Sequence, residues 1–144
     1  MLVQQILKSK GVSHVVTVKP QTTVSQAAEV LSEKRIGTVV VSDTGSDAQG
    51  IMSERDIVRE LGRRGSGCLS DTVSQIMTRD LVTCHGDDTA DEVLAKMTEG
   101  RFRHMPVMDG NRMIGLISLG DVVKARLSEV SMEKDALEGM IMGY

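Results

Sequence analysis

An internal duplication constrains this chain more than any other feature, because it covers nearly everything before residue 128. The main offset between the two copies is 66 positions, and it becomes 65 after Asp43 and 70 near the N-terminus. Identical pairs at offset 66 are Val16 and Val82, Thr17 and Thr83, Thr23 and Thr89, Glu33 and Glu99, Arg35 and Arg101, Val41 and Val107, and Asp43 and Asp109. At the other two offsets they are Gly50 and Gly115, Ser53 and Ser118, Asp56 and Asp121, Val58 and Val123, Val3 and Val73, Gln5 and Gln75, and Ile6 and Ile76. The chain therefore has to fold as two similar halves, with four additional residues around 8–13 in the first.

Each half predicts the same order of elements, β-α-β-β-α. The expected strands are 15–18, 38–41 and 50–52 in the first half, and 81–84, 104–108 and 113–117 in the second. Capping boxes at Thr23-x-x-Gln26 and Thr89-x-x-Glu92 predict the first helix of each half, and a second helix begins at Ser53 or Ser118. Asp109-Gly110 predicts a hairpin turn, whereas three glycines within 62–67 predict an irregular linker.

Composition narrows the class of protein. Hydrophobic residues make up 40% of the chain and charged residues 26%, which is typical of a globular domain, and ten Met beside one Phe and one Tyr predict a core of aliphatic and thioether side chains. Cys68 and Cys84 form no metal-binding spacing, so we expect inert thiols and no metal. A net charge of −3 without a block of basic residues argues against nucleic acid. No leader or membrane-spanning segment is evident, so we expect a cytoplasmic protein without a membrane partner.

Two motifs at the ends of the halves resemble a known family. Gly50-Ile-Met-Ser-Glu-Arg-Asp56 and Gly115-Leu-Ile-Ser-Leu-Gly-Asp121 share the pattern Gly-h-h-Ser-x-x-Asp, where h is apolar, and the segment 103–109 reads Arg-His-Met-Pro-Val-Met-Asp. Together these are similar to a pair of cystathionine-β-synthase-type (CBS) domains, often called a Bateman module. The first half departs from the family pattern, because Val40 stands where proline is frequent.

The resemblance implies a fold, a function and a domain organisation. The fold is α/β, with tandem CBS repeats whose two small sheets pack in pseudo-two-fold symmetry with helices outside. The expected boundaries are repeat 1 at 1–62, a linker at 63–72, repeat 2 at 73–127 and a helical tail at 128–144. Such pairs bind adenosine derivatives between the repeats, form homodimers and regulate another enzyme or transporter, so we expect no catalytic site. AMP is the first candidate ligand, and ATP or NAD(H) are the others.

The ribose site is expected at Ser53 and Asp56 in one half and at Ser118 and Asp121 in the other. Glycine lets a backbone approach a ligand, a helix N-terminus meets a phosphate, and a carboxylate accepts both ribose hydroxyls. The alternative interpretation is that both Ser-x-x-Asp segments are only capping boxes.

The phosphate site is expected at Arg103 and His104, which resemble the basic pair that nucleotide-binding members carry before the central strand. Their counterparts, Gly37 and Thr38, carry no charge, so the two halves should differ in affinity. The alternative is a solvated basic turn. Arg55 and Arg59 are weaker candidates that fit solvent-facing helix positions.

The resemblance places the adenine base on backbone groups of Val16, Thr17, Val82 and Thr83. These residues are also expected in the strands, and backbone recognition leaves no side-chain signature in a sequence. Both roles therefore stay open.

The rival function is a ligand-free module for dimerisation or protein interaction. It rests on the tail after Ser128, where one side of a predicted helix is too apolar to be left in water. The apolar residues are Val130, Leu137, Met140, Ile141 and Tyr144.

Overall fold

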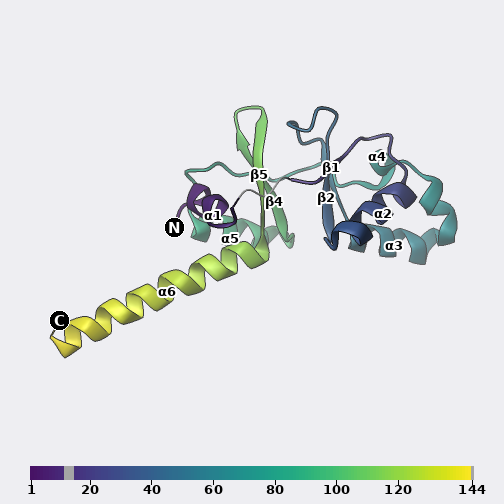
Figure 1. Ribbon diagram of the computed structural model, residues 1–144. Helices are drawn as coiled ribbons and strands as arrows, with labels where there is room; N and C mark the ends of the chain where they lie inside the picture. Colours follow the sequence, from purple (N-terminus) through teal and green to yellow (C-terminus); the bar gives the residue numbers. More distant parts are fainter. Residues whose placement is uncertain (12–14, 144) are drawn as a thin grey trace. The chain divides into compact units, whose positions relative to one another are not determined.

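The computed structural model describes residues 1–11 and 15–143, which form two compact units (Figure 1). Unit 1 comprises Met1–Ser13, Thr83–Val107 and Leu116–Tyr144, and unit 2 comprises His14–Val82 and Met108–Gly115. The interleaved ranges show that the units do not coincide with the two sequence repeats. The repeat and linker boundaries expected from the sequence stay predictions.

The first repeat has a three-stranded sheet in the order β1-β2-β3, where β1 is Thr17–Val18, β2 Thr38–Val41 and β3 Gly50–Ser53. β1 is parallel to β2, which is antiparallel to β3. Two helices, α2 (Val24–Lys34) and α3 (Glu54–Arg64), complete the predicted β-α-β-β-α order.

The second repeat has a two-stranded sheet of β4 (His104–Asp109) and β5 (Arg112–Ser118), with helices α5 (Ala90–Gly100) and α6 (Leu119–Met142). The expected strand at 81–84 is wrong: only Cys84 pairs, in a parallel bridge to Val107. In the first repeat Val40 donates its N–H to the Val16 carbonyl, at 3.1 Å. The residue equivalent to Val40 is Pro106, which has no N–H to donate, so this ladder is shorter.

Paired polar residues begin the helices at the predicted positions. Thr23 accepts a hydrogen bond from the Gln26 N–H in a complete capping box, and Thr89 accepts one from the Glu92 N–H. Ser53 and Ser118 are the N-caps of α3 and α6. The hairpin at Asp109-Gly110 is also confirmed, since Gly110 has φ +61 between β4 and β5.

The expected irregular segment at 62–67 is wrong. Helix α3 continues through Arg64, and a 3₁₀-helix covers Gly65–Ser70. Gly65 has φ +73 and ends α3, so this glycine marks a helix C-terminus. Arg64 holds the junction with bonds to Glu60 at 2.8 Å and to Asp71 at 2.6 Å.

The short helix at the start of each repeat packs with the rest of the other repeat. α1 (Val3–Ser9) packs in the core of unit 1 beside second-repeat residues, and α4 (Val73–Ile76) packs in unit 2 beside first-repeat residues. Three backbone hydrogen bonds fix each exchange. In unit 1 they are Val3 N to Asp88 O, Gln4 N to Gly86 O and Ala90 N to Met1 O, each at 2.9 Å. The equivalent bonds in unit 2 are Val73 N to Thr22 O at 2.8 Å, Ser74 N to Pro20 O at 3.1 Å and Val24 N to Asp71 O at 2.8 Å.

The cores are aliphatic and rich in methionine, as predicted. The largest completely buried side chains include Met52 in unit 2 and Met97 and Met105 in unit 1. Both cysteines are buried and unpaired, and burial raises the pKa of the Cys84 thiol to about 12. Cys84 is therefore protonated at neutral pH, as expected of an inert thiol.

Gly50, the first residue of the first Gly-h-h-Ser-x-x-Asp motif, has a structural role in unit 2. A Cβ atom there would lie 2.5 Å from Met77 Sδ and 2.9 Å from the Thr78 carbonyl oxygen. The protein itself therefore occupies the space on the Cβ side of this glycine, and the expected approach of a ligand to its backbone stays a prediction.

We expect Gly50→Ala to lower the free energy of unfolding by about 1–3 kcal/mol, since the backbone of Thr78 cannot easily retreat. Urea denaturation measures the change. Gly62→Ala is the matched control: it lies in α3 with nothing within 4 Å of the added Cβ, and should be neutral or stabilising by up to about 1 kcal/mol. Equal stability of wild type and Gly50→Ala would contradict this account.

Candidate functional site

The turn from β5 into α6 carries the second Ser-x-x-Asp motif, and it forms a reciprocal cap. Ser118 Oγ accepts the Asp121 N–H at 3.1 Å, and Asp121 Oδ2 accepts the Ser118 N–H at 2.9 Å. Asp121 is in the first turn of α6, where the helix dipole favours negative charge. The segment from Ser118 to Asp121 therefore does form a capping box, as the alternative interpretation expected. A cap of this kind leaves acceptor capacity on the carboxylate, so it does not exclude a ligand.

Lys10, which follows α1, contacts this turn through its side chain, and the sequence analysis did not identify it. Its Nζ atom lies 2.9 Å from Asp121 Oδ2 and donates a second hydrogen bond to the Leu116 carbonyl oxygen at 3.0 Å. Burial raises the pKa of Asp121, but the bonds from Lys10 and Ser118 outweigh burial, and the net pKa is lowered. Asp121 is therefore an anion at neutral pH, ready to accept hydrogen bonds.

Arg103 and His104 lie at the start of β4, on the same unit as Asp121 and Lys10. The Arg103 carbonyl accepts the Leu119 N–H at 2.8 Å, which ties the basic pair to the first residue of α6. Burial lowers the pKa of His104, and the nearby positive charges of Lys10 and Arg103 lower it further, while Asp121 opposes both. His104 is thus neutral at pH 7, where it can offer a hydrogen bond while Arg103, which is exposed, supplies charge.

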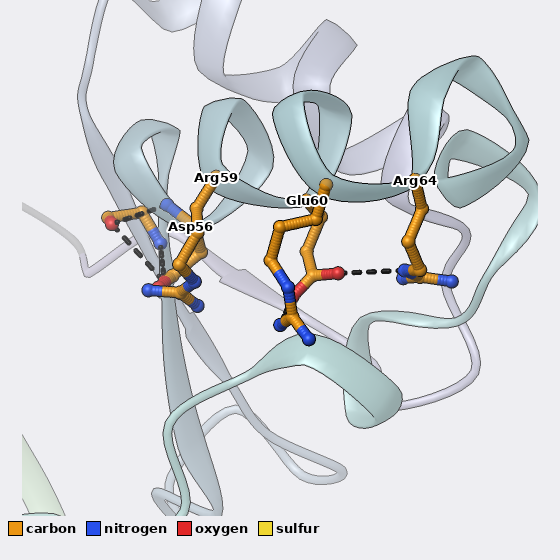
Figure 2. A network of polar contacts seen from close by, with 6 residues as sticks. Asp56, Arg59, Glu60 and Arg64 are labelled. Carbon is orange, nitrogen blue, oxygen red and sulfur yellow. Dashed lines mark hydrogen bonds and ion pairs between the residues drawn. The ribbon is translucent and has the colours of Figure 1, made fainter.

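The first motif has the same cap but different neighbours. Asp56 Oδ2 accepts the Ser53 N–H at 2.8 Å, and Asp56 Oδ1 accepts a bond from Arg59 at 3.0 Å. Figure 2 shows Asp56, Arg59, Glu60 and Arg64 along α3, where Arg64 pairs with Glu60. The hydrogen bond from Arg64 lowers the pKa of Glu60. Both oxygens of Asp56 are thus engaged within its own helix, and its side chain is 11% exposed against 22% for Asp121.

Electrostatic surroundings separate the two motifs further. Where unit 1 has Arg103, unit 2 has Gly37, and a Cβ on Gly37 would lie 3.4 Å from the Glu54 carboxylate. The counterpart of Glu54 in unit 1 is Leu119, which packs against the core. Unit 2 therefore presents an acid where unit 1 presents a basic pair. Arg59 is paired with Asp56 and Arg55 is exposed, in line with their expected positions on the helix surface.

Residues expected to recognise the base differ between the repeats. Thr17 is in β1, and the Val16 carbonyl is used by the ladder with β2, so in the first repeat the ladder role is the one observed. Val82 and Thr83 lie outside any strand, and Val82 is 41% exposed. Their expected role toward a base stays a prediction.

The tail predicted after Ser128 is a continuation of α6, which extends as one helix away from the rest of unit 1 (Figure 1). Its exposed apolar residues include Val130, Leu137, Met140 and Ile141, which are 50%, 60%, 77% and 83% exposed. Tyr144 lies outside the described residues. Across the described part of the chain, no helix is long and apolar enough to cross a membrane, and no three acidic, His or Cys side chains gather as a metal site would require.

Comparison with known proteins agrees with the two repeats. The family model for the CBS domain matches residues 7–63 and again 73–128, so the chain belongs to the CBS domain family and carries two copies. It is 31% identical over 137 residues to the Arabidopsis thaliana CBS domain-containing protein CBSCBSPB2, an alignment that covers 94% of this chain but 25% of that protein. The chain therefore spans a quarter of that relative's length.

Two solved structures show the same fold. A CBS-domain containing protein from Agrobacterium tumefaciens is 43% identical, with a TM-score of 0.82 over 88% of this chain and 99% of that one. The CBS domain pair of protein MJ0100 is 25% identical, with a TM-score of 0.77 over 90% and 98% of the two chains. That structure is a complex with 5′-methylthioadenosine and S-adenosyl-L-methionine.

Proposed function

We propose that this CBS domain pair is a regulatory module without catalysis that binds an adenosine nucleotide, AMP in the first place and ATP or NAD(H) as alternatives. In this proposal the ribose hydroxyls bind the Asp121 carboxylate at the start of α6. The phosphate is bound by Arg103, with His104 as a neutral hydrogen-bond partner. The observation that carries the proposal is the asymmetric charge around the two Ser-x-x-Asp turns.

Charge favours unit 1 for an anionic ligand. Around Asp121 the neighbouring groups are Lys10, Arg103 and His104, whereas the corresponding position in unit 2 brings the Glu54 carboxylate beside Gly37. A carboxylate at that place repels a phosphate, and a guanidinium fork matches the geometry of one. A nucleotide should therefore bind unit 1 in preference to unit 2.

Access to the carboxylate supports the same choice. In unit 2 the Arg59 ion pair and the Ser53 cap use both oxygens of Asp56. The bonds that the structure gives the Asp121 carboxylate go to Oδ2, from Ser118 and Lys10. A ribose diol needs carboxylate oxygens that can still accept hydrogen bonds, and Asp121 offers more of this capacity than Asp56.

The solved relative supports the ligand class. Both compounds in the MJ0100 complex contain adenosine, so a CBS domain pair of the same fold accommodates an adenine base and a ribose. The basic pair at 103–104 adds the preference for a phosphorylated adenosine to this proposal.

Two matched variants test the assignment. Asp121→Ala and Asp56→Ala each remove the carboxylate half of one reciprocal cap and leave the N-cap serine, so each should lower the melting temperature, by a loss of about 1 kcal/mol in the free energy of unfolding. Only Asp121→Ala should weaken AMP binding, by about tenfold or more, because it removes hydrogen bonds between the ribose and a charged group. Calorimetric titration at neutral pH measures both affinities, with ATP and NADH as the alternative ligands.

Two different results would contradict two different parts of this proposal. If both variants lose stability but keep the wild-type affinity for all three ligands, the Ser-x-x-Asp motifs are caps alone and the site assignment is wrong. If the wild type gives no saturable heat with any of the three, the module is not a nucleotide sensor.

A second candidate function is a dimerisation or interaction module, and the exposed apolar side of α6 favours it. More than half of the surface of Leu137 and Ile141 is exposed, on a helix that the structure leaves uncovered over its last turns. Apolar side chains at such spacing are usually buried by another surface. Homodimerisation through this part of α6 is our proposal for what buries them, and it is compatible with nucleotide binding.

Sedimentation equilibrium tests the second candidate. We expect the wild type to associate above the 15.6 kDa of one chain at micromolar concentration, and the double variant Leu137→Gln, Ile141→Gln to shift toward the monomer. The control is Ser131→Gln with Asp135→Gln, two exposed polar positions of the same helix, which should associate like the wild type. A monomeric wild type at high micromolar concentration would rule this function out.

A further inference from the structure

We propose that Lys10 is a phosphate-sensing residue that changes partners when the ligand binds. Without ligand its ammonium group holds the Asp121 carboxylate, and when a ribose takes that carboxylate the ammonium moves to the phosphate. Lys10 thereby makes the site discriminate AMP from adenosine. This inference rests on the proposed function and adds a specificity-determining residue to it.

Geometry places Lys10 in competition with the ribose. Its Nζ atom is 2.9 Å from Asp121 Oδ2, and the side chains of Lys10 and Asp121 are 30% and 22% exposed. A ribose that binds this carboxylate meets an acceptor that already serves an ammonium and the Ser118 N–H. A ribose whose two hydroxyls bind both carboxylate oxygens has to displace the ammonium from Oδ2. An uncharged nucleoside gives that ammonium no new partner, whereas a phosphate does.

The backbone beside Lys10 is held in place, so the exchange needs only a side-chain movement. α1 is fixed on unit 1 by the bonds from Val3 to Asp88 and from Gln4 to Gly86, and the Lys10 N–H donates to the Ile6 carbonyl at 3.2 Å. The lysine side chain is a flexible stem with a compact charge at its end, and its head is already at the surface. Lys10 can therefore reach a second anion near Asp121 without unpacking the helix.

The first repeat shows that the fold does not require a lysine here. Leu116 corresponds to Ile51, and the Ile51 carbonyl accepts the backbone N–H of Thr78 at 2.8 Å. In unit 1 the Leu116 carbonyl receives the Lys10 ammonium instead. The same carbonyl position thus accepts a hydrogen bond from a backbone amide in unit 2 and from a lysine ammonium in unit 1. The basic pair at 103–104 belongs to unit 1, where its counterparts in unit 2 are Gly37 and Thr38.

The test is the ratio of AMP affinity to adenosine affinity, measured by calorimetry in three variants. Lys10→Met removes the charge and keeps the stem, so adenosine should bind more tightly, AMP should bind more weakly, and the ratio should fall by about tenfold. Lys10→Arg keeps the charge and should preserve the ratio. Lys8→Met is the matched control on the same helix, exposed and at a distance of two residues, and should leave the ratio unchanged.

The outcomes separate this inference from the proposed function. If AMP and adenosine both bind and Lys10→Met changes their affinities by the same factor, Lys10 is only a structural lysine and the inference is overturned while the proposed function stands. If neither compound binds the wild type, the proposed function fails and this inference fails with it. Thermal melting checks the fold of each variant, and Lys10→Gln gives the same comparison if Lys10→Met does not fold.

Discussion

The rest of the structure depends on the exchange of α1 and α4, the short helices that begin the two repeats. Each exchange consists of three backbone hydrogen bonds at 2.8–3.1 Å and two buried aliphatic side chains, Val3 and Ile6 in unit 1 and Val73 and Ile76 in unit 2. Backbone N–H and C=O groups need partners, and here groups of one repeat find them in the first segment of the other. Neither repeat can therefore complete its core alone. The exchange also brings Lys10 to the start of α6, which gives unit 1 a charge pattern that unit 2 lacks.

The two Ser-x-x-Asp turns show how one motif serves stability in both units and is proposed to serve binding in one. The reciprocal cap satisfies helix N–H groups in α3 and in α6 alike. What differs is the third partner of the carboxylate, which is Arg59 from the same helix in one case and Lys10 from α1 in the other. A partner on the same helix is held close by the helix itself. A partner on another element can leave when a ligand arrives, which is why we propose Asp121 as the ligand-binding carboxylate.

Much of this arrangement could be predicted from the sequence, because it depends on local signals. The duplication predicted two similar sheets, and Thr23, Ser53, Thr89 and Ser118 predicted where helices begin, since cap chemistry depends on residues three positions apart. The loss of the strand before Cys84 could also have been predicted from the sequence, because Pro106 has no N–H to donate the hydrogen bond that Val40 donates in the first repeat. The glycines at 62–67 led to a wrong prediction of an irregular linker. A positive φ at Gly65 ends α3, whereas Gly62 and Gly67 lie within helical turns.

Other features required three-dimensional information. A repeat alignment gives no signal about which copy a segment will pack against, so the exchange of α1 and α4 was not predicted. Lys10 lies among the additional residues of the first half and has no counterpart that would single it out. The role of Gly50 depends on Met77, 27 positions along the chain, and no local pattern connects them.

The central claim is that a phosphorylated adenosine binds at the start of α6, and a two-dimensional NMR titration with AMP tests it most directly. We expect saturable shifts of the backbone amides of Lys10, Arg103, His104, Ser118 and Asp121, with smaller changes at Ser53 and Asp56. Absence of saturable shifts, or shifts of equal size at Asp56 and Asp121, would contradict it.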